Sequence, residues 1–250
     1  MEKDAPHTRG VTGEPDRPTV TRGAEHYLQA IYALAAERRT VIGARLAQHL
    51  RVSAPSVTQA LKRLERDGLV TLVAKADRKE VHLTPAGFRI GEASTRKHRL
   101  IETWLVSSLK LRSTEAHEAA EHLEDGFSDL LLNRLFDAIG RPFACPHGNP
   151  IPGWGAMDHD GTYLDTVSAG DIVDVGRITE EAEADLDLLA YLERHAVFPR
   201  TRLDILAVDR LSGAVTARTG SGMEVRIEKR SAALIFVRAT GTRPRSPAAG

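Results

Sequence analysis

Apolar positions follow helical spacing through about the first 140 residues and strand spacing from about residue 161 onward. Tyr27, Ile31 and Leu34 stand at i, i+4 and i+7, which predicts an amphipathic helix over 26–37. Further helices are expected over 42–50, 54–68, 89–109 and 128–140, with another around His117. The pattern therefore predicts a mainly α protein with a small β region in its last third.

The helix expected over 54–68 has clear signals at both ends, since Ser53 can cap its N-terminus and Gly68 can stop it. A tight turn joins it to the preceding helix. After it, alternating residues over 69–74 and 80–84 predict a β-hairpin with a charged tip. Helices joined by a tight turn and followed by a basic hairpin are typical of a winged helix-turn-helix.

The start of this third helix favours contact with DNA. Gln59 can pair bidentately with adenine, and Pro55 can touch a thymine methyl group. Short side chains suited to base edges are Ser53, Pro55, Ser56, Thr58 and Gln59. Side chains placed for phosphates are Lys62, Arg63, Arg78 and Lys79. The alternative is a winged helix that serves protein contacts only.

A second helical unit is expected over 89–153. Its helix over 128–140 is strongly apolar, and Leu130, Leu131, Leu135 and Phe136 are interpreted as core or as a dimer interface. The loop that follows is rich in Pro and Gly. Cys145 and His147 in this loop could bind a metal as a pair, but two such residues are weak evidence, and a structural role is favoured.

The last unit is expected to be a small, partly open β-barrel. Its predicted strands cover 171–178, 202–208, 214–219, 223–228 and 233–239, and an acidic helix over 181–195 interrupts them. The sequence here has no Gly-rich phosphate loop and no nucleophile elbow, which argues against a nucleotide enzyme or an esterase.

The net charge is zero, but its distribution is uneven. Residues 20–99 hold 15 Lys/Arg and 7 Asp/Glu, whereas residues 100–139 hold 3 and 8. A basic block before an acidic one favours one part for a polyanion and another for a cation. No apolar run approaches the ~20 residues that span a membrane, and the first 20 residues do not form a secretory signal. The single cysteine fits a cytoplasmic location.

Candidate metal ligands stand at helical spacing in two places. His98 and Glu102 are four residues apart, and His117 is followed by Glu121, Glu124 and Asp125. On one unbroken helix the last four would fall within an arc of about 100°. The zinc-protease pattern HExxH fails, because the second imidazole, on His122, lies about 140° from His117. Solvated carboxylates remain the alternative for Glu124 and Asp125.

Five segments of the chain are informative together, namely EHYLQAIY, APSVTQALKRLERDGLV, LTPAGF, RKHRLIE and HGNPIPG. They resemble the diphtheria toxin repressor family of metalloregulators, and the similarity extends from about Gly23 to Val237. The resemblance implies a three-domain member of the manganese transport regulator type, with a winged helix, a helical dimerisation and metal domain, and an SH3-like (FeoA-like) barrel. The expected units are 1–22 (disordered), 23–88, 89–153, 154–164 (linker), 165–238 and 239–250 (disordered).

The resemblance also implies two metal sites per subunit. The ancillary site would contain His98, Glu102, His117, Glu180 and Glu183, with Glu183 standing where relatives have Gln. The primary site would contain His26, Glu121, Glu124 and Asp125. His26 could instead cap or pack on the first helix.

Two departures from the iron-responsive branch bear on the metal. That branch has Met and Cys where this chain has His26 and Glu121, and carboxylates suit hard cations such as Mn²⁺ better than soft sulfur ligands do. We therefore expect a homodimeric, Mn²⁺-dependent repressor of metal-uptake genes that binds a double-stranded DNA operator. It would have no enzymatic activity, no small-molecule substrate and no membrane partner. The alternatives are an Fe²⁺-dependent regulator and, in other classes, a metal-storage protein or a metallohydrolase.

Overall fold

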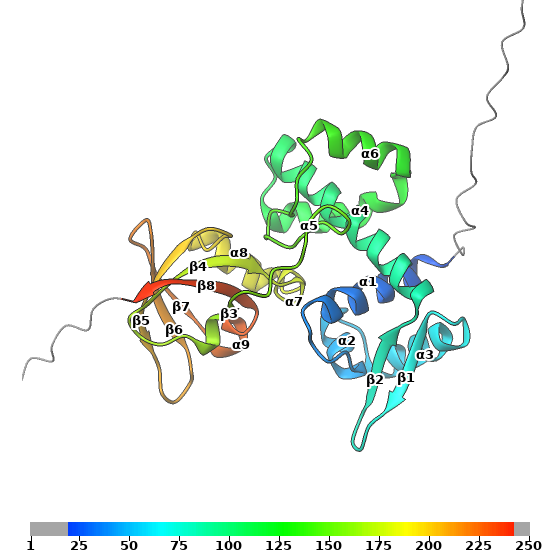
Figure 1. The fold of residues 1–250 in the computed structure, drawn as a ribbon, viewed down its shortest axis with the longest axis horizontal. Helices are drawn as coiled ribbons and strands as arrows, with labels where there is room; N and C mark the ends of the chain where they lie inside the picture. Colours follow the sequence, from blue (N-terminus) through cyan, green and yellow to red (C-terminus); the bar gives the residue numbers. More distant parts are fainter. Residues whose placement is uncertain (1–19, 243–250) are drawn as a thin grey trace, which may run out of the picture.

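The computed structural model describes residues 20–242, arranged as three units (Figure 1). A winged-helix unit comes first, a helical unit follows, and a unit built on a six-stranded antiparallel sheet, the sheet unit, completes the chain. The fold class predicted from the sequence is confirmed. Of the tails expected over 1–22 and 239–250, residues 1–19 and 243–250 lie outside the described residues. None of the helices in the described part combines the length and apolar character needed to cross a membrane.

The winged-helix unit forms as the sequence predicts. Its elements are α1 (Arg22–Ala36), α2 (Gly43–His49), α3 (Ala54–Arg66), β1 (Val70–Ala74) and β2 (Lys79–Leu83). The Ser53 hydroxyl caps α3 by accepting a hydrogen bond from the Ser56 amide at 3.3 Å. Leu28, Ile31 and Leu46 are fully buried in its core. Burial of this apolar face stabilises the short helices, which would be marginal alone.

Helix α4 (Pro85–Leu109) runs without a break from the winged-helix unit into the helical unit (Figure 1). It passes very close to α1, where a Cβ on Gly91 would lie 2.6 Å from the Leu28 carbonyl oxygen. The expected boundary after residue 88 therefore falls inside a helix. Since one rigid helix belongs to both units, the core beside α1 and the ligands on α4 are mechanically connected.

The helical unit adds α5 (Ser113–Leu123), η1 (Glu124–Gly126) and α6 (Asp129–Ala138). The expectation of one unbroken helix from His117 to Asp125 is wrong, because α5 ends at Leu123 and a 3₁₀ turn follows. The chain turns at Gly126, which lets Phe127 pack 6.1 Å from the ring of Trp104. Glu124 and Asp125 therefore belong to this 3₁₀ turn and not to α5.

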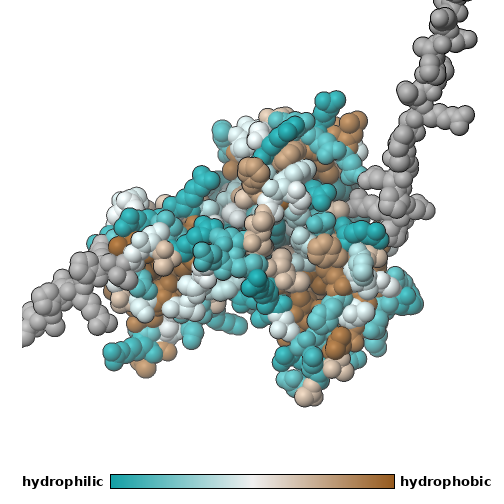
Figure 2. Space-filling model, in the orientation of Figure 1, coloured by the Kyte–Doolittle hydropathy of each residue, from teal (hydrophilic) through white to brown (hydrophobic). Residues whose placement is uncertain are grey.

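Helix α6 exposes much of its apolar surface. Leu130 is 67% exposed, Leu131 is 50% exposed, and nearby Phe143 is 73% exposed. In Figure 2, brown spheres stand among teal and white ones at this end of the molecule. Leu135 and Phe136 instead pack partly against the core of the helical unit. Of the four apolar residues predicted as core or interface, two face the core and two face outward.

The sheet unit contains the strands β3 (Thr162–Tyr163), β4 (Asp171–Ile178), β5 (Arg202–Val208), β6 (Val215–Thr219), β7 (Glu224–Ile227) and β8 (Ile235–Thr242). They pair in the order β3-β8-β4-β5-β6-β7, and every pair is antiparallel. The short helical segments are η2 (Leu164–Thr166), α7 (Glu180–Glu183), α8 (Leu186–Arg194) and α9 (Lys229–Ala232). β3 lies inside the expected linker because it pairs with β8, and β8 extends into the expected tail because its last residues pair with β4.

The acidic helix expected over 181–195 is in fact two helices. Asp185 separates α7 from α8 and caps α8 by accepting a hydrogen bond from the Leu188 amide at 3.1 Å. An Asp that caps a helix leaves the helical backbone conformation, so the preceding segment cannot continue through it. This break gives α7 a direction of its own, between the sheet unit and α1 (Figure 1).

A buried ion pair joins the sheet unit to the winged-helix unit. The Arg177 guanidinium on β4 donates to both carboxylate oxygens of Glu37, at 3.0 and 2.6 Å, and both side chains are less than a tenth exposed. The Tyr163 hydroxyl donates to the same carboxylate at 2.8 Å. The Phe236 ring lies 4.0 Å from the guanidinium carbon. The pairing is bidentate and shielded from water, so it fixes how the two units sit together.

Candidate metal centre

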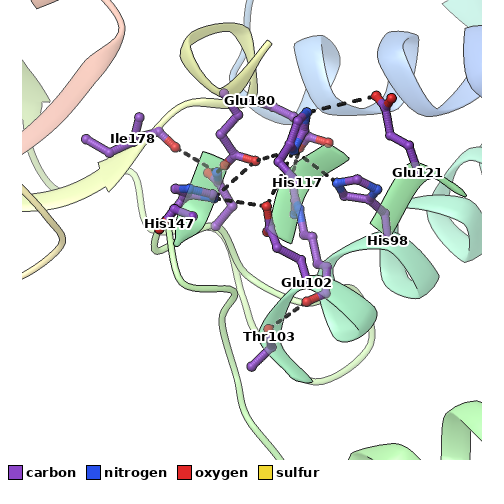
Figure 3. Close-up of polar contacts among 12 residues, drawn as sticks. His98, Glu102, Thr103, His117, Glu121, His147, Ile178 and Glu180 are labelled. Carbon is purple, nitrogen blue, oxygen red and sulfur yellow. Dashed lines mark hydrogen bonds and ion pairs between the residues drawn. The ribbon is translucent and has the colours of Figure 1, made fainter. Parts of the chain in front are cut away.

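Helices α4 and α5 bring three predicted ligands together (Figure 3). His98 and Glu102 lie one turn apart on α4, and His117 faces them from α5. The His98 Nε2 and His117 Nδ1 atoms are 3.3 Å apart, and His117 Nδ1 lies 3.4 Å from Glu102 Oε1. All three side chains are nearly or fully enclosed. His98, Glu102 and His117 thus form one compact cluster, as their spacing in the sequence predicts.

The loop after α6 adds two ligands that the sequence analysis favoured as structural. His147 Nδ1 lies 3.3 Å from Glu102 Oε1, and Cys145 presents its sulfur within 4.8 Å of ligand atoms of both residues. The loop is pressed on β4, where the Ile178 amide donates to the His147 carbonyl at 2.8 Å. A Cβ on Gly148 would lie 2.5 Å from the Gly176 carbonyl oxygen. Only glycine allows this close approach, which brings the loop to the cluster.

Helix α7 supplies a further carboxylate from the sheet unit. Glu183 Oε2 lies 3.3 Å from His147 Nδ1 and 3.8 Å from His117 Nδ1. Its other oxygen accepts a hydrogen bond from the Asn149 amide at 2.5 Å. Glu180, the other ligand expected from this segment, pairs with Arg99 instead. The structure therefore brings Glu183 into the cluster and holds Glu180 against a guanidinium.

The polar atoms of this cluster are short of hydrogen bonds. Both carboxylate oxygens of Glu102 and both ring nitrogens of His147 are buried without a hydrogen-bond partner of good geometry. A buried charge without partners is costly, so such a group is normally paired or coordinated to a metal. Carboxylate, imidazole and thiol groups are also the donors that transition metals bind. The donor set fits a divalent cation.

The same crowding shifts the proton equilibria. Burial opposes the charged imidazole of His147, yet the carboxylates of Glu183 and Glu102 raise its pKa well above the usual value. Although burial disfavours its charge, Glu102 has its pKa lowered well below the usual value by His147 and His117. Burial also opposes the charge on His98, but Glu124 raises its pKa to about 9. Protons and a metal would compete for these sites.

Burial raises the pKa of the Cys145 thiol to about 12 and the nearby Glu183 adds to this, so the thiol is protonated near neutral pH. A thiol must lose its proton to bind a metal. A cation at this cluster would therefore release protons on binding.

The predicted primary-site residues line one cavity of about 310 Å³. Its walls come from α1, α2, α4, α5, η1 and α7, so all three units contribute to it. His26, Glu121, Glu124 and Asp125 all face this cavity. A cation that links the winged-helix unit to the helical unit needs ligands from both, and this cavity is lined by α1 and by the α5–η1 segment.

The three carboxylates of the primary site nevertheless contact other side chains. Asp125 pairs with Arg22 at 3.1 Å, and Glu124 Oε1 lies 2.6 Å from His98 Nδ1. Glu121 Oε1 is 3.9 Å from the Nε2 atom of His117. In the described part of the chain, the ligand sets gathered within 4.8 Å are the two that contain Glu102. The four expected primary-site residues therefore line one cavity, but their ligand atoms do not lie within 4.8 Å of one another.

The predicted DNA-contacting side chains form an exposed face on α3 and the β1–β2 hairpin. Pro55, Gln59, Lys62 and Arg63 are exposed. The Ser53 and Ser56 hydroxyls are 2.9 Å apart, and the Thr58 hydroxyl bonds back to the Ala54 carbonyl at 3.0 Å. At the hairpin tip Lys79 is exposed, while Arg78 pairs with Glu80 at 3.1 Å. The predicted face exists, although three of its hydroxyls bond locally.

Two family models match the chain. Residues 19–76 match the N-terminal DNA binding domain of iron dependent repressors, and residues 84–153 match their metal binding and dimerisation domain. The iron-dependent repressor IdeR of Mycobacterium tuberculosis is 35% identical over 192 residues, covering 72% of this chain and 82% of the relative. The diphtheria toxin repressor of Corynebacterium glutamicum is 32% identical over 222 residues, covering 82% and 95%.

Two solved structures have the same fold, and their descriptions name manganese where the family models name iron. A manganese-dependent transcriptional repressor in complex with manganese superposes with a TM-score of 0.73 at 31% identity, covering 86% of this chain and 99% of that one. The manganese regulator SloR superposes with a TM-score of 0.72 at 30% identity, covering 86% and 98%.

Proposed function

This chain belongs to the iron-dependent repressor family of metal-dependent DNA-binding repressors, and we propose that it senses Mn²⁺ and represses metal-uptake genes. The family models and the IdeR relative are named for iron, whereas the two solved structures described above are named for manganese, so the choice of metal rests on the residues of this chain. The relatives are repressors, and none of those described above is an enzyme.

The donor set of the cavity supports manganese. His26, Glu121, Glu124 and Asp125 offer one imidazole and three carboxylates, and no sulfur atom is among them. Oxygen-rich sites suit hard cations, whereas thiolate or thioether ligands suit softer ones. Glu121 lies where iron-type members have Cys, and this single replacement carries the assignment. We expect these four residues to hold the cation that activates DNA binding.

Activation follows from linkage between the two units. His26 belongs to α1 of the winged-helix unit, and Glu121 belongs to α5 of the helical unit. A bound cation supplies positive charge that both residues share, so α1 is held against α5. If this arrangement suits the operator, metal and DNA each tighten the binding of the other by the same factor.

We propose that the second cluster has a structural role. His98, Glu102 and His117 lie in the helical unit, while Glu183 reaches them from α7 of the sheet unit. Held by one cation, these residues would tie the sheet unit to the helical unit. Glu180 is less suited, because Arg99 already neutralises it.

We further propose that the protein acts as a homodimer through α6. Leu130, Leu131 and Phe143 expose apolar surface where the matching family model describes a dimerisation domain. A second copy covering this surface would bury it and would set two α3 helices at the spacing of two half-sites.

Fe²⁺ is the alternative metal, and Cys145 favours it. Its sulfur belongs to the Glu102 cluster, so that site offers one soft donor. Mn²⁺ in the cavity and a softer ion at the Glu102 cluster are compatible, because the two sites have different donors.

Operator binding in the presence of different metals tests the proposal. Fluorescence anisotropy with promoter DNA of a metal-uptake gene would be measured with Mn²⁺, anaerobic Fe²⁺, Zn²⁺ or a chelator. We expect Mn²⁺ to tighten binding and the variants His26→Ala and Glu121→Ala to abolish that effect. His122→Ala is the matched control, because this exposed histidine lies beside Glu121 and bonds only its own helix at Glu118. Equal affinity with Mn²⁺ and with chelator would refute the metal switch.

A further inference from the structure

His49 is a histidine that neither the sequence patterns nor the family resemblance marked as a ligand. It is the last residue of α2, the first helix of the helix-turn-helix, and its side chain lines the same cavity as His26 and Glu121. Its Nδ1 atom is enclosed and has no hydrogen-bond partner. An enclosed ring nitrogen without a partner, in a cavity lined by acids and imidazoles, needs a physical explanation.

The groups facing His49 belong to both predicted metal sites. Burial is the main influence and lowers the pKa of His49. The carboxylates of Glu180 and Glu121 act in the opposite direction, and the imidazoles of His26 and His117 add to the lowering. His49 therefore lies among carboxylates and imidazoles contributed by α1, α5 and α7. The neutral imidazole is also the form that binds metal ions.

We propose that His49 is a further ligand of the divalent cation held in this cavity, so that the helix-turn-helix itself takes part in metal binding. The inference rests on the proposed function and extends it. With His49 added to His26, Glu121, Glu124 and Asp125, the proposed ligand set has two imidazoles and three carboxylates, which still suits a six-coordinate first-row ion such as Mn²⁺.

The position of His49 gives this ligand a direct connection to the DNA-contacting helix. Only three residues, Leu50, Arg51 and Val52, lie between His49 and Ser53, the N-cap of α3. Arg51 has a left-handed backbone with a φ of 52°, which makes this turn tight. Because this turn is short and tight, a shift of the end of α2 should also shift the start of α3. Fixing His49 on the cation would therefore fix the start of α3, where Pro55 and Ser56 face outward.

The test compares His49→Asn with His49→Asp in the full chain. Asn keeps a similar size but is a poor ligand, whereas Asp restores a metal-binding group. Mn²⁺ affinity would be measured by calorimetric titration and by displacement from a fluorescent chelator. We expect His49→Asn to weaken Mn²⁺ binding by about tenfold or more, since even partners outside the coordination sphere cost about 10–100-fold. We expect His49→Asp to restore most of the loss, and Gln48→Ala, an exposed neighbour on α2, to have no effect.

A spectroscopic measurement separates a ligand from a packing residue. Pulsed electron paramagnetic resonance of bound Mn²⁺ detects coordinated imidazole nitrogen, and His49→Asn should remove one such coupling relative to the wild-type protein at equal Mn²⁺ loading. Weaker binding with unchanged nitrogen coupling would overturn the proposal, and so would unchanged affinity. If His26→Ala and Glu121→Ala also left Mn²⁺ binding unchanged, the proposed function itself would fail. If only His49→Asn had no effect, the further inference alone would fail.

Discussion

Replacing Glu37 by alanine should weaken the attachment of the sheet unit to the winged-helix unit. The Glu37 carboxylate accepts two hydrogen bonds from Arg177 and one from the Tyr163 hydroxyl. The variant leaves a guanidinium that is 3% exposed without its counter-charge. It does not remove every partner, because Arg177 still donates to the Asp158 carbonyl at 2.8 Å and lies against the Phe236 ring.

The magnitude follows from these contacts. Removing one partner of a buried ion pair costs about 3–5 kcal/mol, because the remaining charge stays buried. The contacts that Arg177 keeps place the expected cost near the lower limit, about 3 kcal/mol. For a chain of this length each kcal/mol lowers the melting temperature by about 2–4 °C, so we expect a decrease of about 6–12 °C.

An exposed ion pair on the same sheet provides the control. Arg218 and Glu224 also lie 2.6 Å apart, but their side chains are 42% and 57% exposed. Exposed pairs contribute about 0–1 kcal/mol, so Glu224→Ala should change stability very little. Thermal unfolding of both variants in chelator, followed by circular dichroism, gives the comparison. Equal losses in the two variants would show that the buried pair does not hold the units together.

Three further predictions concern DNA, protons and packing. Gln59→Ala should weaken operator binding by roughly 1–3 kcal/mol without changing random-DNA binding, whereas Lys79→Ala should weaken both alike; gel shifts on the two DNAs would show whether α3 reads sequence. Because the pKa of His98 is raised to about 9, its stabilisation of the metal-free protein is complete below about pH 6.5 and lost as pH rises through about 9. Mn²⁺ affinity should change in the opposite direction and increase with pH, and a flat profile of both quantities would contradict this. Gly91→Ala places a Cβ 2.6 Å from the Leu28 carbonyl oxygen and should cost about 1–3 kcal/mol in urea unfolding; a neutral result would mean that α1 and α4 can separate freely.

The sequence predicted best where one local pattern determines one element. The winged-helix unit formed as expected, because apolar spacing, the Ser53 cap and the Gly68 stop all indicate the same helix boundaries. His98 and Glu102 met His117 for the same reason, since a four-residue spacing on a helix fixes a shared face.

The errors arose where a turn interrupts a helix-like pattern. Helix α5 ended at Leu123, so that Glu124 and Asp125 stand in a 3₁₀ turn, and Asp185 ended α7 by capping α8. Both segments are rich in helix-compatible residues, so periodicity alone could not locate the breaks.

Residues brought in by tertiary packing were the hardest to find. His147 reaches Glu102 because its loop packs on β4, which no local spacing encodes. His49 shares the cavity with α1 and α5 through the packing of three helices. For His147 a signal did exist, since Cys and His separated by one residue stand in a loop of glycine and proline.

Helix α7 is only four residues long, yet each part of it faces a different neighbour. Glu180 pairs with Arg99 on α4, Glu181 lies 3.5 Å from Arg45 on α2, and Glu183 joins the Glu102 cluster.

A single residue inserted in α7 would rotate the side chains that follow it by about 100° around the helix axis, so they would face other neighbours. The contacts of α7 therefore depend on its exact length. Natural variants of this protein should therefore keep the length of 178–185 constant. Insertions should be found instead at the exposed turn around Gly220 and Gly222, where a Cβ would meet no other atom within 4 Å.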